Sequence, residues 1–381
     1  MNIKVAIIFH HLGPYHVARI KSLLAKIPRL TVIELASRAS DRSWARPDTD
    51  GFQLITLVND TYENVSPHKF VKSMEEALRK CDPECLVICG YAHPAMRAAA
   101  RWAKNSAGIG TVLLSESQHV DQKRNTLKEY VKGLWIRKYC DAAFVGGASA
   151  ASYLQHMGFP RERIWRGYNV VDNAYFESGA EAIRTNMKDI QNELGLPLRY
   201  FLYVGRFSEE KNLIRLLKAY KSYLSGKGEK AWGLVMAGSG PQERELRTTA
   251  DSLGLKDICW PGFVQIDDLP KYYAFASGFI LPSIREPWGL VVNEAMAAGL
   301  PVLVSVNCGC VLDLVVPGVN GKLFDPYSEA DIAGALNWLS SGEIDLNALG
   351  KASKSLVSHC SLEHWAASLE DCITALSRNS K

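Results

Sequence analysis

The sequence predicts an α/β protein made of two Rossmann-like domains, each built on a parallel sheet. The chain has 381 residues, which is more than a single hydrophobic core usually accommodates. Short apolar runs alternate with segments of helical periodicity in both halves, as expected for βαβ units. The composition, 47% hydrophobic and 22% charged, excludes a disordered or fibrous protein.

The first domain is expected to span residues 1–176. Its strands are predicted from apolar runs at 4–9, 31–35, 54–57, 86–89, 111–114 and 143–145. Helical segments between these runs include 14–25, 67–80 and 95–105. The alternation of strands and helices predicts crossover connections and parallel pairing.

The second domain is expected to span residues 200–360. Its strands are predicted at 200–204, 233–237, 258–260, 278–281, 302–305 and 321–324. Its helices include 212–224, 242–253, 269–275, 290–298 and 329–340. The polar stretch 177–199, which ends in Gly-Leu-Pro, is predicted to be a linker, and 362–376 forms an amphipathic helix. Ligands of such domains bind beyond the carboxyl ends of the strands, so we expect the domains to face each other across a cleft.

The charge is uneven along the chain. The net charge is +4, too small to indicate a nucleic-acid partner. Residues 1–180 carry 24 basic and 17 acidic side chains, and much of the excess lies in 123–138. There, basic residues alternate with Leu, Trp and Ile, which is typical either of a solvated helix with an apolar stripe in the core or of a helix on an anionic membrane. The first interpretation, a solvated helix with its apolar stripe in the core, is preferred.

The cellular location is predicted from what the sequence lacks. No apolar stretch reaches the roughly 18–20 residues that span a bilayer, and the first residues have no signal-peptide pattern. The nine cysteines have no paired zinc-ligand spacing, so we expect free thiols in a reducing compartment. We therefore expect a cytoplasmic protein, with a position peripheral to the inner face of the membrane as the alternative.

The segment from Glu286 to Pro301 carries the strongest chemical signal. It follows the strand predicted at 278–281 and opens the helix predicted at 290–298, whose first amides are free to bind an anion or sugar oxygens. Glu286 precedes this helix start and Glu294 lies within the helix. Two carboxylates beside an anion site are suited to accept hydrogen bonds from sugar hydroxyls. The alternative is a helix whose first-turn glutamate complements the helix dipole.

Three further segments follow strands of the second domain. Gly205-Arg206 and Lys211 lie at a helix entrance, where a guanidinium fork and an ammonium suit a diphosphate, unless this is only a solvated basic loop. Gly238-Ser-Gly240-Pro241 is a glycine-rich turn after a strand. Gly262-Phe263-Val264 follows another strand, and its backbone could line a nucleobase.

Together these segments resemble the GT-B glycosyltransferases of family 4, which retain anomeric configuration. The resemblance is carried by Glu286 and Glu294 with seven residues between them, Gly205-Arg206 with Lys211, Gly238-Ser-Gly240-Pro241 and Leu281-Pro282-Ser283. It covers residues 200–376 well and 1–176 only in outline. It implies the GT-B fold, with residues 361–381 crossing back to an acceptor-binding first domain and a nucleotide-sugar-binding second domain.

The resemblance also implies a role for each matching residue. Glu286 is the implied catalytic-site residue that holds hydroxyls of the donor sugar. The implied donor-binding residues are Gly13, Arg206, Lys211, Gly238, Phe263, Val264, Gly289, Leu290 and Glu294. Among them, Arg206 and Lys211 bind the diphosphate, Glu294 the ribose, and Phe263 and Val264 border the base.

The first domain departs from the family pattern at one position. Family members often carry a histidine at the end of the fifth strand, where this chain has Glu116. Either Glu116 acts at the acceptor or a nearby histidine, His93 or His119, replaces the missing one. Glu116 and His93 are the candidates for catalytic residues on this side, and a structural role for His93 remains the alternative.

The predicted function is therefore that of a retaining glycosyltransferase. It would transfer a hexose-type sugar from a nucleotide diphosphate sugar to a hydroxyl of a saccharide or lipid-linked acceptor, in polysaccharide or glycoconjugate biosynthesis. The resemblance implies that neither a metal nor another cofactor is needed. Residues 123–138 are the candidate membrane contact, and no nucleic-acid partner is expected. The alternatives are a nucleotide-sugar epimerase and an inactive sugar-nucleotide-binding protein.

Overall fold

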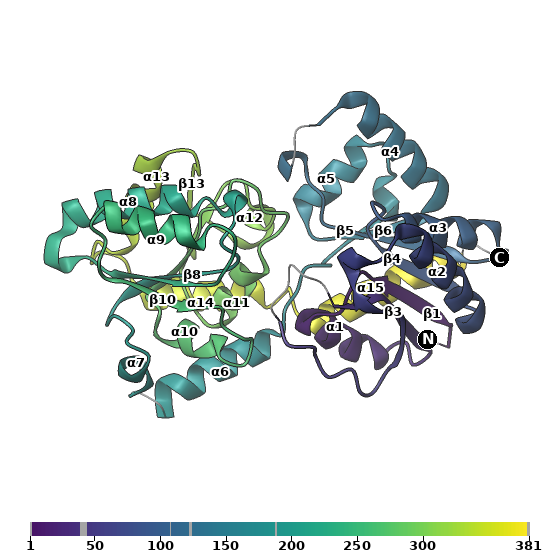
Figure 1. Cartoon of the computed structure of the whole chain (residues 1–381), viewed down its shortest axis with the longest axis horizontal. Helices are drawn as coiled ribbons and strands as arrows, with labels where there is room; N and C mark the ends of the chain where they lie inside the picture. The colour runs from purple at the N-terminus through teal and green to yellow at the C-terminus, as the bar shows by residue number, and fades with distance from the viewer. Residues whose placement is uncertain (1, 39–43, 107, 122–123, 187–188, 379–381) are drawn as a thin grey trace. The chain divides into compact units, whose positions relative to one another are not determined.

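The computed structural model describes residues 2–38, 44–106, 108–121, 124–186 and 189–378. The chain divides into two compact units, shown in Figure 1. Unit 1 comprises Met1–His119, Lys123–Val171 and Cys360–Lys381. Unit 2 comprises Val120–Gln122 and Asp172–His359. Each unit contains its own parallel sheet, and each is described separately below.

Unit 1 is built on a seven-stranded sheet in the order β3-β2-β1-β4-β5-β6-β7. All its strand pairs are parallel. The strands are β1 Val5–Phe9, β2 Leu30–Arg38, β3 Gln53–Thr61, β4 Cys85–Cys89, β5 Gly110–Ser115, β6 Ala142–Val145 and β7 Ile164–Arg166. The central strands are continuous apolar runs because helices cover both faces of the sheet.

The helices of unit 1 form two hydrophobic cores, one on each face of the sheet. They are α1 Pro14–Leu24, α2 Pro67–Cys81, α3 Pro94–Asn105, α4 Thr126–Tyr139, α5 Ala148–His156 and α15 Leu362–Arg378, with short 3₁₀ turns at Tyr62–Asn64 and Arg161–Arg163. A further 3₁₀ turn, His119–Asp121, begins with the last residue of a unit 1 segment, and its other two residues are grouped with unit 2. Alternate residues of β1 point into different cores. Ile8 lies in the core that α2 and α3 cover, and Ile7 lies in the core that α1 and α15 cover. Trp365 on α15 is fully buried in the second core, so the C-terminal helix is part of unit 1.

Unit 2 is built on a six-stranded parallel sheet in the order β10-β9-β8-β11-β12-β13. The strands are β8 Tyr200–Val204, β9 Gly233–Ala237, β10 Ile258–Gly262, β11 Gly278–Leu281, β12 Val302–Ser305 and β13 Gly321–Phe324. The helices are α6 Asn173–Asn186, α7 Ile190–Glu193, α8 Leu213–Lys227, α9 Glu243–Ser252, α10 Leu269–Phe275, α11 Leu290–Ala297, α12 Val311–Leu314, α13 Glu329–Leu339 and α14 Leu346–Val357, with 3₁₀ turns at Glu209–Lys211 and Gly228–Lys230.

The residues predicted as a linker, 177–199, are grouped with unit 2. Within this stretch, Arg184 on α6 reaches the ends of two other helices. Its Nε donates to the carbonyl of Ala274 at 2.7 Å and its guanidinium donates to the carbonyl of Ala298 at 2.7 Å. These bonds satisfy carbonyls that a helix end leaves without an intrahelical partner, and they fix α6 to the rest of the unit.

The strand order creates one switch point in each unit. In unit 1 the chain builds the sheet outward in opposite directions from β1 and β4, and in unit 2 it does so from β8 and β11. Loops that leave the carboxyl ends of such neighbouring strands diverge and leave space for a ligand between them. The functional residues are therefore sought after β1 and β4 and after β8 and β11.

Candidate functional site

The switch point of unit 2 brings together two charged residues that lie far apart in the sequence. Lys211 follows β8, and Glu286 follows β11. The Lys211 ammonium donates a hydrogen bond to Oε2 of Glu286, and Ser283 Oγ donates to the same oxygen at 3.4 Å. The two charged side chains are 18% and 11% exposed, so the ion pair is largely shielded from water.

The Glu286 carboxylate determines the charge state of Lys211. Burial alone would lower the pKa of the Lys211 ammonium, but the adjacent carboxylate outweighs burial and raises that pKa above its ordinary value. Lys211 is therefore fully protonated at neutral pH. A raised pKa means that the charged form of Lys211 is stabilised, so the site retains a cation although water is largely excluded.

A second carboxylate, that of Glu210, supports this cation. Burial raises the pKa of Glu210, but a hydrogen bond from Ser208 at 2.6 Å and the positive charges of Lys211 and Arg206 lower it more, so the net shift is downward. The backbone carbonyl of Glu210 also accepts a bond from the Ile284 amide at 2.9 Å. Arg206 itself is exposed, directly after β8. The loops after β8 and β11 are thus held together by both charge and backbone bonds.

Two buried or half-buried asparagines, which the sequence analysis did not single out, fix these loops further. Asn212 donates to the carbonyls of Pro282 and Pro326, at 3.0 and 2.7 Å. Asn307 donates to the carbonyl of Ile284 at 3.1 Å. Four loops at the same sheet edge are therefore tied together before any ligand binds, which is the condition for electrostatic preorganisation. Their position in the segments between a strand and the next helix is the sequence signal that could have identified them.

The helix start predicted to bind an anion is formed as expected. Gly289 is the N-cap of α11 and has φ 100°, and a Cβ on it would lie 2.9 Å from Leu281 Cδ2. A residue with a side chain is therefore strained at this position. The amide of Val292 donates to the carbonyl of Gly289 at 2.8 Å, and the amides of Leu290 and Val291 before it lie in the first turn, where a helix supplies no backbone acceptor. Trp288 Nε1 donates to Asn293 Oδ1 at 2.9 Å and so fixes the loop that precedes the helix.

The remaining predicted donor-site residues lie around the same sheet edge. Glu294 on α11 is fully buried and accepts a hydrogen bond from the Tyr273 hydroxyl at 2.8 Å. Phe263, directly after β10, is 36% exposed, and Val264 beside it is half-buried. A Cβ on Gly238 would lie 1.9 Å from the Gly205 carbonyl oxygen, so this glycine permits close approach of the loops after β8 and β9.

In unit 1, Gly13 and His93 lie at helix starts beside the switch point. Gly13 precedes α1, and its amide donates to Nδ1 of His16 at 3.1 Å. Gly13 has φ −118°, and a Cβ there would make only an ordinary contact, 3.7 Å from that nitrogen. The backbone of unit 1 therefore does not itself require a glycine at this position.

The three candidates for the polar acceptor position occupy different places in unit 1. His93 is the N-cap of α3, and its Nδ1 accepts a bond from the Ala95 amide at 3.1 Å. Glu116 follows β5, where its charge is one of the factors that raise the pKa of Tyr168, after burial and Cys89. His119 packs against the rings of Tyr153 and His156 on α5, at centroid distances of 5.1 and 5.0 Å.

We expect the stability of the protein to fall below pH 6.5, in part through His93. Burial, and then the positive charge of Arg97, lowers the pKa of His93 below 6.5. Because the unfolded chain binds the proton more readily, His93 contributes stability that is present above pH 6.5 and is lost as the pH falls through the lower folded pKa. His93→Asn keeps an oxygen acceptor for the helix start but does not titrate. Its melting temperature should decline less than that of the wild type between pH 8 and 5.5.

The matched control for this experiment is His359→Asn, since His359 is exposed in unit 2. It should follow the wild-type decline. Parallel pH profiles for His93→Asn and the wild type would contradict the interpretation.

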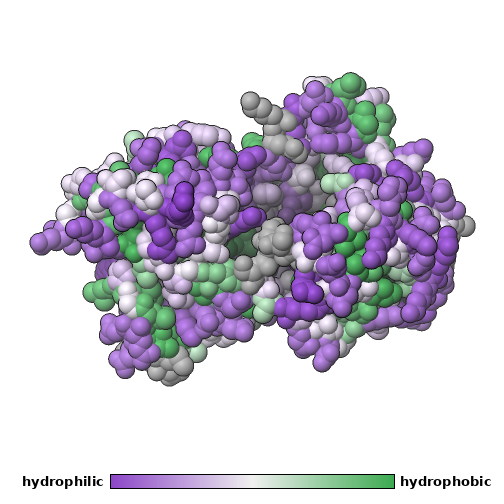
Figure 2. All heavy atoms as spheres, in the orientation of Figure 1, coloured by the Kyte–Doolittle hydropathy of each residue, from purple (hydrophilic) through white to green (hydrophobic). Residues whose placement is uncertain are grey.

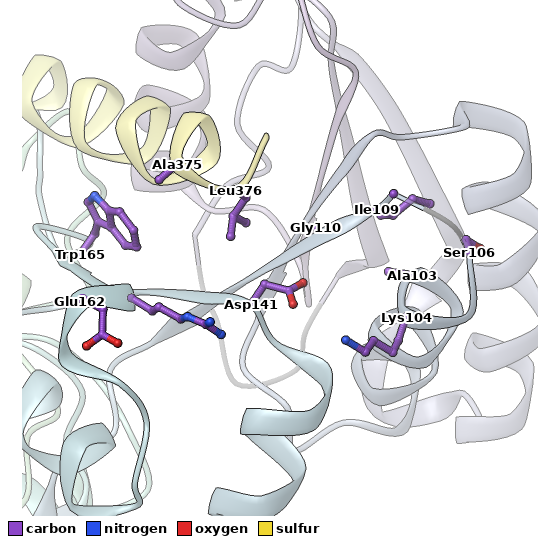
Figure 3. A pocket seen from close by; sticks show the side chains of 12 residues that line it. Ala103, Lys104, Ser106, Ile109, Gly110, Asp141, Glu162, Trp165, Ala375 and Leu376 are labelled. Carbon is purple, nitrogen blue, oxygen red and sulfur yellow. The ribbon is translucent and has the colours of Figure 1, made fainter. Parts of the chain in front are cut away.

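A cavity of about 610 Å³ lies elsewhere in unit 1, as Figure 3 shows. It is lined by Gly110 at the start of β5, Asp141 just before β6, Trp165 in β7 and Leu376 of α15. These are the amino ends of the strands, opposite to the edge where the switch point lies. None of the predicted site residues lines this cavity. Within the described ranges, no cluster of three or more His, Cys, Asp or Glu side chains is arranged to hold a metal ion.

Comparison with known proteins gives consistent results for sequence and fold. Residues 186–356 match the family model described as "Glycosyl transferases group 1". The chain is 32% identical over 169 residues to an alpha-monoglucosyldiacylglycerol synthase of Streptococcus pneumoniae, covering 44% of this chain and 37% of the synthase. The chain spans only about a third of the length of the first curated relatives it matches, 34% and 37%.

Solved structures resemble the chain over nearly its whole length. The sucrose-phosphate synthase of Thermosynechococcus elongatus matches with a TM-score of 0.78 at 19% identity, covering 99% of this chain and all of the synthase chain. The protein HepE of Anabaena, solved in complex with UDP, matches with a TM-score of 0.73 at 16% identity, covering 98% of this chain and 100% of that chain. At these identities the comparison establishes the fold.

Proposed function

Because residues 186–356 belong to the glycosyl transferases group 1 family and the chain has the GT-B fold, we propose that the protein is a retaining, metal-independent glycosyltransferase. The predicted family resemblance and fold class are confirmed. The proposed reaction transfers a hexose-type sugar from a nucleotide diphosphate sugar to a hydroxyl of a saccharide or lipid-linked acceptor. The observation that carries it is the shielded Lys211–Glu286 pair next to Arg206 at the switch point of unit 2.

The diphosphate of the donor would bind to Arg206 and Lys211. A guanidinium offers parallel donors to two phosphate oxygens, and an ammonium carries three hydrogens. Lys211 can therefore hold Glu286 and a phosphate oxygen at the same time. As the bond between sugar and phosphate breaks, negative charge accumulates on the leaving diphosphate. Cations already fixed at that position lower the barrier, because they need no rearrangement when the charge appears.

The other predicted residues would position the rest of the donor. Glu286 would accept hydrogen bonds from sugar hydroxyls, and the amides of Gly289 and Leu290 would meet sugar or phosphate oxygens. Glu294 would hold the ribose, because a carboxylate that accepts a bond from Tyr273 has further acceptor sites for a ribose hydroxyl. Phe263 and Val264 would border the base.

Unit 1 is proposed to bind the acceptor. The backbone of unit 1 does not itself require a glycine at position 13. A ligand that approaches the backbone closely there would explain why this residue has no side chain. Glu116 or His93 would contact the acceptor hydroxyl from the loops after β5 and β4. His119 is the weaker candidate, because its ring packs against α5.

The exposed face of α4 is proposed to contact an anionic membrane. Large apolar side chains on it are unusually exposed: Leu127 72%, Tyr130 61%, Val131 56% and Leu134 45%. The predicted apolar stripe is only partly in the core, because Ile136 is 1% exposed whereas Leu127 and Leu134 are not buried. Figure 2 shows hydrophobic surface interspersed with hydrophilic surface over this helix, where Lys128 and Lys138 are exposed. Apolar and cationic groups on one helix face suit a lipid surface.

No helix among the described residues is both long and apolar enough to cross a membrane. The contact proposed for α4 is with the membrane surface. The double variant Leu127→Ser/Tyr130→Ser should reduce binding to vesicles of phosphatidylcholine and phosphatidylglycerol by about tenfold, because it removes two partly inserted side chains. Sedimentation with vesicles measures this. Leu312→Ser, at an equally exposed position of unit 2, should bind as the wild type does. Equal binding of both variants would contradict the proposal.

The proposed reaction is tested with a panel of nucleotide diphosphate sugars and simple glycoside acceptors. We expect nucleotide release that depends on one donor, persists in EDTA, and yields a product with the anomeric configuration of that donor by NMR. Inversion, loss of activity in EDTA, or conversion of the donor to an epimer without any acceptor would each overturn part of the proposal.

A further inference from the structure

Three rings from three different loops meet at the switch point of unit 1. His10 follows β1, Tyr62 follows β3 and His93 follows β4. The ring centroids are 5.8 Å apart for His10 and Tyr62, 6.0 Å for His10 and His93, and 5.4 Å for Tyr62 and His93. We refer to His10, Tyr62 and His93 as the ring cluster.

The ring cluster rests on a rigid base but is not itself part of the core. Phe70 on α2 is 1% exposed. Its ring stacks on that of Tyr62 with a centroid distance of 5.6 Å and makes a T-shaped contact with that of His93 with a centroid distance of 5.3 Å. The three rings above it are each only partly buried. The contacts with Phe70 fix Tyr62 and His93, and the partial burial of all three rings leaves part of their surface accessible.

Two rings of the cluster, His93 and Tyr62, are uncharged at physiological pH. Burial, and then the charge of Arg97, lowers the pKa of His93, so its imidazole is uncharged. Burial, and then the charge of Glu63, raises the pKa of Tyr62, so its phenol remains protonated. The guanidinium of Arg97 donates to the carbonyls of Tyr91 and Ala92. Neither His93 nor Tyr62 offers a charge that would pair with an ionic ligand, which favours an uncharged one.

The hydrogen-bonding groups of the ring cluster are also defined. Because Nδ1 of His93 accepts a bond from the Ala95 amide, the neutral imidazole carries its proton on Nε2 and is a donor there. The Tyr62 hydroxyl can both donate and accept. A flat ring face with donors at its rim complements a sugar ring, whose C–H groups line one face and whose hydroxyls lie at its edge.

We propose that the ring cluster is a subsite for an uncharged sugar ring of the acceptor, with Tyr62 as the ring on which it stacks. This inference rests on the proposed function, because it takes unit 1 as the acceptor-binding unit. It adds a substrate class, a neutral sugar residue rather than a phosphorylated group or lipid chain, and it makes Tyr62 and His10 determinants of acceptor specificity.

The test uses the full chain with p-nitrophenyl glucosides, galactosides and mannosides as acceptors. Tyr62→Ala should raise the acceptor KM about tenfold, as expected for the loss of one stacking contact, while the KM for the donor stays within about twofold. Tyr62→Phe keeps the ring face but loses the hydroxyl, so its acceptor KM should lie between those of the wild type and Tyr62→Ala. Tyr62→Leu keeps apolar bulk over Phe70 without the aromatic face and should behave as Tyr62→Ala does.

Two further variants keep the test decisive if Tyr62→Ala or Tyr62→Leu unfolds. His10→Ala should raise the acceptor KM in the same direction, whereas His359→Ala in unit 2 should leave it unchanged. An acceptor KM that is unaltered in a folded Tyr62→Ala or His10→Ala variant would overturn the subsite.

Failure of the subsite can be distinguished from failure of the proposed function. If the wild type turns over a donor but the variants leave the acceptor KM unchanged, only the subsite is wrong. If the wild type turns over no donor, saturation-transfer NMR with the same glycosides decides: binding that is lost in Tyr62→Ala supports the subsite, and absent or unaltered binding refutes it.

Discussion

Arg206→Ala is expected to reduce nucleotide release from the donor by about 10²–10³-fold, the usual cost of removing one preorganised group that stabilises developing charge. Arg206 is exposed, directly after β8, so its loss should leave the fold intact. Arg206→Lys keeps the charge but not the planar fork and should fall between the wild type and Arg206→Ala. Steady-state assays of nucleotide release, with melting curves for each variant, measure both expectations.

The matched control is Arg244→Ala, because Arg244 is an exposed arginine of the same unit, on α9. It should leave turnover unchanged. If Arg206→Ala kept full turnover, the assignment of the diphosphate to this loop would be wrong.

Glu286→Ala is expected to affect both stability and turnover. It leaves the Lys211 ammonium shielded from water without its carboxylate, which should cost about 3 kcal/mol of unfolding free energy. It also removes the proposed acceptor for sugar hydroxyls, so turnover should be lost. Glu286→Gln retains a hydrogen-bond acceptor, so it should be more stable than Glu286→Ala while still lacking most of the activity.

A double variant separates the two effects. Lys211→Met/Glu286→Gln removes both charges, so its unfolding free energy in urea should recover toward that of the wild type. Its turnover should remain lost, because neither the cation nor the carboxylate is present. Glu229→Ala, at an exposed position of unit 2, is the control. Recovery of turnover in the double variant would show that the pair is only structural.

The sheet of each unit could largely be predicted from the sequence, because buried parallel strands are continuous apolar runs. The predicted runs at 200–204, 233–237 and 321–324 coincide with β8, β9 and β13. The strand β7 was missed, because it has three residues and none of them is fully buried. A strand of that kind is formed by pairing with β6 rather than by its own hydrophobic pattern.

The candidate site was predictable residue by residue but not as a set of contacts. The glycine, arginine and glutamate positions after β8 and β11 follow from local patterns and from the family resemblance. The pair of Lys211 and Glu286 joins positions 75 residues apart, and no local pattern encodes it. The same holds for Asn212, whose bonds to Pro282 and Pro326 depend on three loops meeting at one sheet edge.

Unit 1 was less predictable, because its loops carry few motifs. The sequence drew attention to His93 but not to Tyr62, since a single tyrosine after a strand is an ordinary feature. The ring cluster becomes visible only in the fold, where Tyr62, which follows the edge strand β3, meets His10 and His93, which follow the neighbouring strands β1 and β4.

The switch point of unit 2 is proposed to bind the diphosphate of a nucleotide sugar. Isothermal titration calorimetry of UDP, GDP and ADP with the wild type and with Arg206→Ala measures this binding. We expect one of the three to bind the wild type at one site per chain, and Arg206→Ala to weaken that binding about 10- to 100-fold, the contribution of a hydrogen bond to a charged group. Equal affinity of the wild type and Arg206→Ala for that nucleotide, or binding of none of the three, would contradict the claim.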